Sequence, residues 1–346
     1  MARIVQWATG SMGRTSIRRI LDDPRHQLVG GFVYGARKNG NDLGAIARRD
    51  PIGVAATNDR QQILDLDADL VLHMPRITLP YDALVDDVAA LLRSGKNIIS
   101  VAGFHFPQAH GEDYVRRLHD AAIKGGATLA GVGVNPGLIV ERLALAATAM
   151  SHELERLAVF ETVDASAMTS PDFVFGLMGF NSDPAAADIR SGPLADLYGQ
   201  LFSEVLHFAA AELGTSVREI RPDHRLTLAP KPLTIASGQI EEGRVAATEW
   251  RWTALTQAGP EILMSILWTA DPSLHGPDKL GHWKIEITGR PAITMTLDIT
   301  EADPAMPPSR ALTDAVVAVA VRAIPDVIAA PPGFFAYRPP AAWSAA

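Results

Sequence analysis

A strand, a turn of small residues and an amphipathic segment follow one another directly near the N-terminus. The apolar residues in 4–7 predict a buried strand, and those in 17–21 predict one apolar face of a helix. The turn between them, 8–14, reads Ala-Thr-Gly-Ser-Met-Gly-Arg. A helix that begins directly after such a turn offers free N–H groups and a partial positive charge to a phosphate. The segment therefore predicts an α/β fold that binds a dinucleotide.

This turn departs from the dinucleotide pattern G-x-G-x-x-G at one position. Ala8 stands where the first glycine is expected. Gly10 is expected to let the backbone approach a pyrophosphate, and Gly13 to let the helix pack close to its strand. The predicted cofactor contacts in this segment are Thr9, Gly10, Ser11, Met12, Gly13 and Arg14.

The loop after the second predicted strand, 28–34, bears on the choice of cofactor. In a dinucleotide fold the end of this strand meets the adenosine ribose, where an Asp or Glu binds the ribose hydroxyls of NAD. This sequence has Arg37 and Lys38 there instead. A guanidinium offers a planar pair of donors to a 2′-phosphate, which a carboxylate would repel. We expect a preference for NADP(H), with NAD(H) possible; the alternative is a solvated basic loop.

Strands and helices continue to alternate as far as residue 134. Strands are predicted near 54–56 and at 68–74, 97–101 and 127–132, with helices after 58–59 and at 81–94 and 112–124. Short β–α connections of this kind predict a Rossmann domain, a doubly wound parallel sheet, in 1–134. His73 and Met74 end one of these strands and are expected beside the cofactor, His73 as a packed side chain.

The pattern changes after 135–137. A helix is predicted at 138–150, a strand at 157–163 and a helix near 197–213, and strands at 248–255, 262–269, 284–287 and 293–299. Residues 242–243 and 289–291 resemble hairpin turns. These features predict an α+β domain with a mostly antiparallel sheet in 135–309. The apolar helix 310–324 is expected to pack back on the first domain, and the chain after Pro331 to be loose.

Composition excludes several classes of function. The chain has 346 residues, 47% of them hydrophobic, no cysteine and a net charge of −8. It therefore has no disulfide or thiolate chemistry, and its net charge argues against nucleic-acid binding, which needs a basic face. We expect no membrane segment, no signal peptide and no metal site, and hence a cytoplasmic protein with a small-molecule substrate.

Four segments together suggest a family. They are the turn 8–13, Lys-Asn-Gly-Asn-Asp-Leu-Gly at 38–44, Gly-Val-Gly-Val-Asn-Pro-Gly at 131–137, and Ser-Pro-Asp at 170–172 with Met-Gly-Phe at 178–180. With them the chain resembles, over nearly its whole length, the dihydrodipicolinate-reductase-like proteins that include 2,4-diaminopentanoate dehydrogenase and native amine dehydrogenases. The resemblance implies a Rossmann domain, an α+β domain that holds substrate and forms a homodimer, and NAD(P)-dependent chemistry on an amine or carbonyl.

One departure concerns the chemistry. In the amine-forming relatives a glutamate shortly after the strand that corresponds to 97–100 helps to activate ammonia. Here 101–107 reads Val-Ala-Gly-Phe-His-Phe-Pro, without an acid. His105 is our first candidate for the proton donor, since imidazole titrates near neutral pH. A structural histidine between two phenylalanines is the alternative, and His110 is a second candidate. Ala102 is a candidate cofactor contact.

The remaining candidates lie in or beside the second domain. Asn135 is expected to orient the nicotinamide carboxamide or a substrate oxygen, or else to be a turn residue before Pro136. Asp164 or Glu161 could replace the missing glutamate, and we prefer Asp164. Because the two residues are three apart on a predicted strand, their side chains are expected on opposite faces and cannot act as a close pair. The substrate wall is expected to consist of Phe104, Met168, Phe173 and Met178, with Phe180; plain core is the alternative.

The sequence thus predicts an NADP-preferring oxidoreductase that transfers a hydride to a small, fairly apolar carbonyl or imine, or from the corresponding alcohol or amine. One alternative is a true amine dehydrogenase that uses a carboxylate of the second domain. Another, from a different class, is a non-catalytic NADP-binding sensor.

Overall fold

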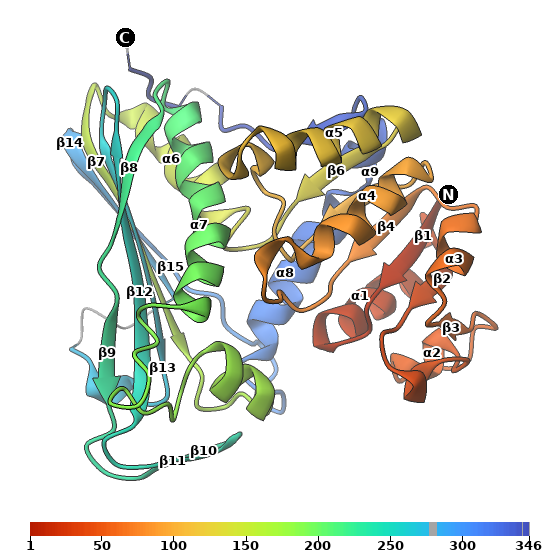
Figure 1. Cartoon of the computed structure of the whole chain (residues 1–346), viewed down its shortest axis with the longest axis horizontal. Helices are drawn as coiled ribbons and strands as arrows, with labels where there is room; N and C mark the ends of the chain where they lie inside the picture. The colour runs from red at the N-terminus through yellow and green to blue at the C-terminus, as the bar shows by residue number, and fades with distance from the viewer. Residues whose placement is uncertain (277–281, 341, 346) are drawn as a thin grey trace. The chain divides into compact units, whose positions relative to one another are not determined.

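The computed structural model describes residues 1–276, 282–340 and 342–345. The chain forms two compact units (Figure 1). The first consists of Met1–Leu138 and Leu312–Tyr337, and the second of Ile139–Ala311 and Arg338–Ala346.

The first unit is built on a seven-stranded sheet in which every pair of neighbours is parallel. The strands, in their spatial order β16-β6-β5-β4-β1-β2-β3, are Gly333–Phe335, Thr128–Gly131, Asn97–Ser100, Leu70–His73, Ala2–Trp7, His26–Phe32 and Ala56–Thr57. The order reverses at β1, so the carboxyl ends of β1 and β4 face the crevice in which such sheets bind ligands. This is the predicted Rossmann architecture.

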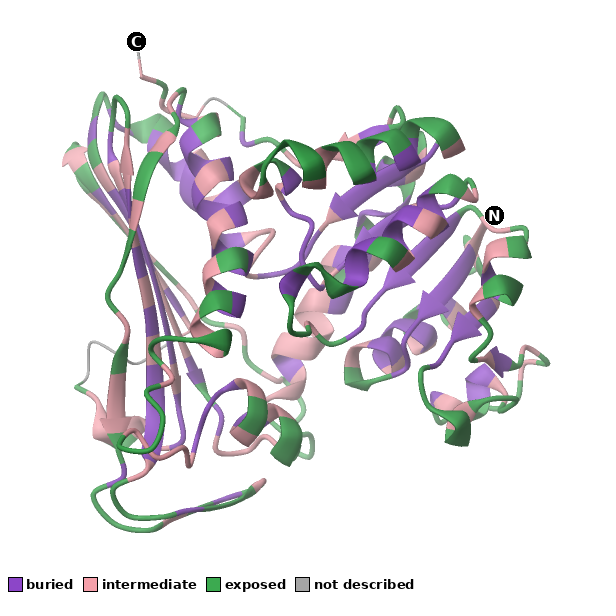
Figure 2. Ribbon diagram, in the orientation of Figure 1, coloured by how far each residue is buried: buried purple, intermediate pink, exposed green. Residues whose placement is uncertain are grey.

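Helices cover both faces of this sheet. Apolar side chains of α3 (Arg60–Asp65), α4 (Val85–Arg93) and α5 (Glu112–Gly125) pack on one face. Those of α1 (Ser11–Leu21), α2 (Leu43–Ile46), α8 (Arg310–Arg322) and α9 (Ile324–Ala329) pack on the other. The strands are largely buried on both faces, and most of the helices are exposed on their outer sides, whereas α8 is largely half-buried (Figure 2). This burial explains why the strands read as apolar runs.

Strand β16 corrects the expectation that the chain is loose after Pro331. It pairs in parallel with β6 and forms an edge of the sheet. Phe334 packs with the core on one face and Phe335 with the core on the other, as alternating strand residues must. The segment beyond it is also fixed, because the backbone N–H of Trp343 donates to Thr148 Oγ1 (3.0 Å). Three residues are too few to show the alternation that reveals a strand.

The second unit contains a mostly antiparallel sheet. Its path β15-β14-β7-β13-β12-β8 runs through Ile293–Leu297, Trp283–Arg290, Glu153–Asp164, Glu261–Thr269, Val245–Thr256 and Val217–Pro222, and β9 (Arg225–Leu228) also pairs with β12. Only β7 and β13 are parallel to each other. Helix α7 (Pro193–Glu212) covers one face, where the Tyr198 ring meets Trp250 and Trp268. The fold class is therefore as predicted, and β8 and β9 were not foreseen.

Two local expectations in the second unit need correction. The helix predicted at 138–150 starts as a π-helix (Ile139–Ala144) and continues as α6 (Leu145–Ala147) and a 3₁₀ turn (Thr148–Met150). The turn at 242–243 does not join two paired strands, because β11 (Gly238–Ile240) pairs with β10 (Leu233–Ile235). The other turn, 289–291, does connect the hairpin β14–β15. A second π-helix spans Asp172–Leu177.

The short 3₁₀ segments complete the structure. They are Ala36–Lys38, Tyr81–Leu84, Pro107–His110 and Pro272–Leu274. None of the helices in the described ranges is long and apolar enough to cross a bilayer.

Candidate cofactor and catalytic site

Ala8 stands at the position of the first glycine, which the pattern places in the tight turn. Its φ is +70°, a left-handed conformation that is costly for residues with a β-carbon. The buried amide of Gln6 holds the turn, because its Nε2 donates to the carbonyl oxygens of Ala8 (3.0 Å), Trp7 (3.2 Å) and Leu72 (3.2 Å). Sequence reasoning missed Gln6. A buried polar residue within an otherwise apolar strand is the signal that could have revealed it.

The two glycines of the turn have different surroundings. A β-carbon added to Gly13 would lie 2.1 Å from the carbonyl oxygen of Ala8, whereas one added to Gly10 would meet nothing within 4 Å. Gly13 thus allows the helix and the turn to pack closely, and Gly10 leaves open space beside the backbone. No side chain caps the N-terminus of α1, so its first N–H groups are available to a phosphate.

Three cationic side chains gather beside this turn. Lys38 Nζ donates to the carbonyl oxygen of Thr9 (2.7 Å) and to Thr9 Oγ1 (3.1 Å). Burial, and then the charges of Arg14 and Arg37, lower the pKa of Lys38. Among the described residues, neither the Arg14 nor the Arg37 guanidinium has a hydrogen-bond or ion-pair partner. These donors and the open turn fit a phosphorylated dinucleotide.

Exposed Tyr34 stands at the carboxyl end of β2. The indole Nε1 of Trp7 donates to its hydroxyl (3.0 Å), and its ring meets Phe32 edge-on at 5.1 Å. Phe32 in turn stacks on Trp7 at 4.0 Å. This aromatic set ties the end of β2 to the end of β1, next to the turn.

His73 is fully buried at the end of β4, as a packed side chain. Burial lowers its pKa to about 3, so the imidazole is neutral at physiological pH. Its Nδ1 is hydrogen-bonded to Ser100 Oγ (3.0 Å), which also accepts the N–H of Ala102 (3.1 Å). Ser100 was not predicted as a site residue. The pairing of β4 with β5, which places these two residues side by side, is the signal for it. Met74, the next residue, is buried among apolar side chains.

The loop that carries His105 has an unusual backbone. Gly103 and Phe104 both have positive φ values, +106° and +69°. The loop then passes so close to β6 that a β-carbon on Gly131 would lie 2.3 Å from the backbone N of His105. Left-handed residues at a strand end often mark functional sites. The His105 side chain is only 6% exposed, and its Cε1 lies 4.0 Å from where a β-carbon of Gly133 would stand.

The other candidates of the first unit lie around this loop. Phe104 contributes an aromatic ring near His73 (6.3 Å) and Tyr114 (6.4 Å). His110 packs against the rings of Tyr81 (5.0 Å) and Tyr114 (4.7 Å). Half-buried Asn135 precedes a turn that folds back on Gly133.

For the candidates of the second unit, the structure shows their contacts with other residues of that unit. Trp283 Nε1 donates to Glu161 Oε2 (3.0 Å), so this carboxylate is already engaged. Asp164 is exposed at the end of β7 and accepts the N–H of Ser166 (2.9 Å). Met178 and Phe180 are buried core residues, each 1% exposed. Met168 and Phe173 are half-buried against the same core. The substrate-binding role of these side chains stays a prediction.

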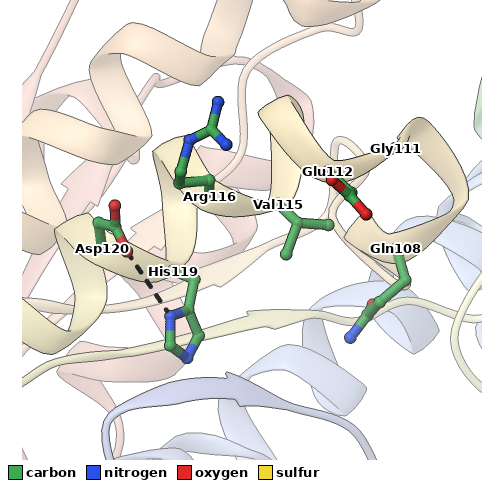
Figure 3. Close-up of a pocket in the computed structure, with 7 residues that line it drawn as sticks. All are labelled: Gln108, Gly111, Glu112, Val115, Arg116, His119 and Asp120. Atoms are coloured by element: carbon green, nitrogen blue, oxygen red, sulfur yellow. Dashed lines mark ion pairs between the residues drawn. The ribbon is translucent and has the colours of Figure 1, made fainter.

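A pocket of about 490 Å³ opens beside helix α5 of the first unit (Figure 3). It is lined by Gln108, Gly111, Glu112, Val115, Arg116, His119 and Asp120. His119 Nδ1 and Asp120 Oδ1 are 3.9 Å apart. None of the predicted site residues lines this pocket. The described part of the chain also contains no group of three or more His, Asp or Glu side chains that could hold a metal ion.

Comparison with known proteins identifies the family. No family model matches the sequence. A 4-hydroxy-tetrahydrodipicolinate reductase from Burkholderia multivorans is 30% identical over 234 residues, 64% of this chain and 80% of that protein. The chain belongs to the dihydrodipicolinate-reductase-like family.

Other members of the group cover more of the chain. An amine dehydrogenase from Streptomyces virginiae is 25% identical over 315 residues, 87% of this chain and 86% of that protein. The structure of an amine dehydrogenase from Mycobacterium smegmatis superimposes with a TM-score of 0.79 at 20% identity, over 96% of this chain and 94% of that one. This dihydrodipicolinate-reductase-like protein is an NAD(P)-dependent oxidoreductase. The alternative of a non-catalytic sensor finds no support in relatives that are named as enzymes.

Proposed function

We propose that the protein prefers NADP(H) and transfers a hydride to a small, fairly apolar carbonyl or imine, or from the corresponding alcohol or amine. The observation that carries this proposal is the pair of guanidiniums beside the turn. Arg14 lies in the first turn of α1 and Arg37 follows β2, and neither has a protein partner among the described residues. The positive charges of both arginines lower the pKa of Lys38, which supports the interpretation that the three side chains lie close together.

Like charges crowded together destabilise a protein unless a ligand compensates them. A 2′-phosphate carries two negative charges and several acceptor oxygens, which suit the fork of an arginine. NAD has a neutral hydroxyl at this position, and it leaves that repulsion uncompensated. The two arginines therefore favour the phosphorylated cofactor, although the chain as a whole is acidic.

The residues of the His105 loop would serve the chemical step. When bound, the nicotinamide supplies or accepts the hydride. The protein has to provide a proton to the developing oxyanion or amine. The His105 imidazole is the candidate donor, because its loop is fixed by the Ser100–Ala102 hydrogen bond and by close packing on Gly131. His73 stays neutral and is a packing residue in this scheme.

Binding titrations test the cofactor preference. Arg37→Ala is expected to weaken NADPH binding at least tenfold, since about 1.5–3 kcal/mol of charged hydrogen bonding is lost, and to leave NADH binding unchanged. Arg93→Ala is the matched control, because Arg93 is exposed at the end of α4, next to the amino end of β5. Equal affinity of the unaltered protein for NADPH and NADH would refute the preference.

Amine dehydrogenation is a second candidate, favoured by the similarity to amine dehydrogenases over most of the chain. The acid that this chemistry needs is absent from 101–107, and exposed Asp164 could supply it. Ammonia-dependent oxidation of NADPH with short ketones or aldehydes would support this alternative. If Asp164→Asn loses this ammonia-dependent activity but retains ammonia-independent ketone reduction, Asp164 is the acid that amine dehydrogenation needs. A rate of NADPH oxidation that does not depend on ammonia would refute amine dehydrogenation.

The homodimer implied by the family also stays a proposal. Light scattering of the purified full chain tests it, and a molecular mass near that of one chain would refute it.

A further inference from the structure

Lys38 and Arg37 are adjacent in sequence but make very different interactions. The Arg37 side chain is exposed and has no partner among the described residues. Lys38 is half-buried, and two of its three N–H groups donate to Thr9, one to the carbonyl oxygen at 2.7 Å and one to the hydroxyl at 3.1 Å. The two cations therefore cannot be treated as one phosphate-binding pair.

The loop that bears both residues is firmly held. The backbone N–H groups of Lys38 and Asn39 donate to Gly35 and Ala36 and close a 3₁₀ turn, and that of Gly40 donates to the carbonyl oxygen of Ala56 (2.8 Å). A lysine fixed at its backbone and at its amine links this loop rigidly to the turn after β1.

We propose that Lys38 is a positioning residue, which fixes the pyrophosphate-binding turn through Thr9 and so supports NADPH and NADH equally, whereas Arg37 recognises the 2′-phosphate. This inference rests on the cofactor site proposed above.

The orientation of one peptide group explains how Lys38 would act. By binding the Thr9 carbonyl, Lys38 fixes the peptide between Thr9 and Gly10. In a trans peptide the N–H points opposite to the carbonyl, so the Gly10 N–H is directed away from Lys38. This preorganises the turn before the cofactor arrives, next to the unfavourable left-handed backbone of Ala8. Loss of the lysine would free the turn and cost affinity for any dinucleotide.

Three ligands and two matched substitutions separate the roles. Lys38→Met and Arg37→Met each remove one charge and keep an unbranched side chain, and Arg93→Met is the surface control. The ligands are NADPH, NADH and adenosine 2′-monophosphate, which carries the 2′-phosphate but no pyrophosphate. Dissociation constants are measured on the full chain by titration.

The proposal gives a distinct pattern for each variant. Lys38→Met should weaken NADPH and NADH by the same factor, roughly tenfold, because a released turn has to be ordered when the dinucleotide binds, and leave adenosine 2′-monophosphate within about twofold. A general loss of structure would not spare the fragment. Arg37→Met should weaken NADPH and the fragment and leave NADH unchanged.

The opposite results overturn the proposal. A loss confined to NADPH and the fragment in Lys38→Met would show that Lys38 binds the 2′-phosphate itself, and unchanged affinities for all three would show that the link to Thr9 is dispensable. If Arg37→Met leaves all three dissociation constants unchanged, the proposed NADP preference is wrong. The NADH titration of Lys38→Met still tests the positioning role of Lys38. If Lys38→Met does not fold, Thr9→Val removes the hydroxyl contact alone and should weaken both dinucleotides equally, by about threefold.

Discussion

The carbonyl oxygen of Ala8 occupies the space that a β-carbon of Gly13 would need, at 2.1 Å. Gly13→Ala must therefore displace either the turn or the first turn of α1. We expect a loss of roughly 1–3 kcal/mol in the free energy of unfolding, together with weaker cofactor binding. Urea denaturation and NADPH titration measure the two effects.

Gly10→Ala is the matched control for that substitution. A β-carbon there meets nothing within 4 Å, and the φ of −70° is accessible to alanine. The variant should fold with unchanged stability or a small gain, but bind the dinucleotide more weakly, because the new methyl group occupies the path of the pyrophosphate. Equal destabilisation by the two alanines would contradict the assigned packing role of Gly13.

Ala8→Gly should stabilise the protein. The φ of +70° costs a residue with a β-carbon about 1–2 kcal/mol, of which glycine gives back part through its larger freedom in the unfolded chain. A net gain of about 0.5–1 kcal/mol in urea denaturation is expected. Ala89→Gly, in the middle of α4, should lose about 1 kcal/mol, as glycine does in an ordinary helix. The same sign for both variants would argue against strain at Ala8.

His105→Asn tests the proton donor. Asparagine keeps polar atoms near the ring position but cannot donate a proton by titrating, so turnover should fall at least tenfold; general acid catalysis contributes about 10²–10⁴-fold. The dissociation constant for NADPH should stay the same. His119→Asn, at an exposed histidine of α5, is the control. Unchanged turnover in His105→Asn would remove His105 from the mechanism.

The buried His73 predicts a pH dependence of stability. Its pKa is lowered from 6.5 to about 3 in the folded protein. Between these two pH values the unfolded chain binds a proton at His73 that the folded chain does not. The stabilisation of the folded state by neutral His73 is therefore complete above pH 6.5, and about 1.4 kcal/mol of it is lost per pH unit as the pH falls.

The variant His73→Asn isolates this contribution. Between pH 6.5 and 4.5 the native protein should lose roughly 2–3 kcal/mol more of its free energy of unfolding than the variant does. Carboxylates and the other histidines titrate in both proteins and cancel in the difference. Parallel pH profiles in urea denaturation would show that the pKa of His73 is not lowered in the folded state.

The parallel half of the fold was predictable, because strands buried on both faces show as apolar runs, as at 97–101, and short β–α connections leave few topologies. The mostly antiparallel sheet followed from strand-like runs without intervening helices. The π-helical turns were not predictable, since their apolar spacing resembles that of an α-helix over so few residues. Strand β16 was missed because it is short and its partner β6 is distant in sequence.

The candidate site was predictable to a different extent. The turn and its basic neighbours follow from local pattern, which placed Arg37 and Lys38 together. The proposed roles of Arg37 and Lys38 differ because the Lys38 ammonium binds Thr9. Only the fold brings these two residues together. Two further contacts, from Gln6 to Leu72 and between Ser100 and His73, likewise join neighbouring strands that are distant in sequence.

The parallel sheet takes its last strand, and two of the helices that cover it, from 310–335. A ribosome that has made only the first 300 residues has delivered the whole dinucleotide turn, yet β6 still has a bare edge and one face of the sheet lacks α8 and α9. The nucleotide-binding unit consequently completes its folding only after Ile139–Ala311, the larger segment of the second unit, has been synthesised. Until then the apolar side chains that α8, α9 and β16 cover in the folded unit are exposed, and exposed apolar surface of this kind makes a partly folded chain prone to aggregation.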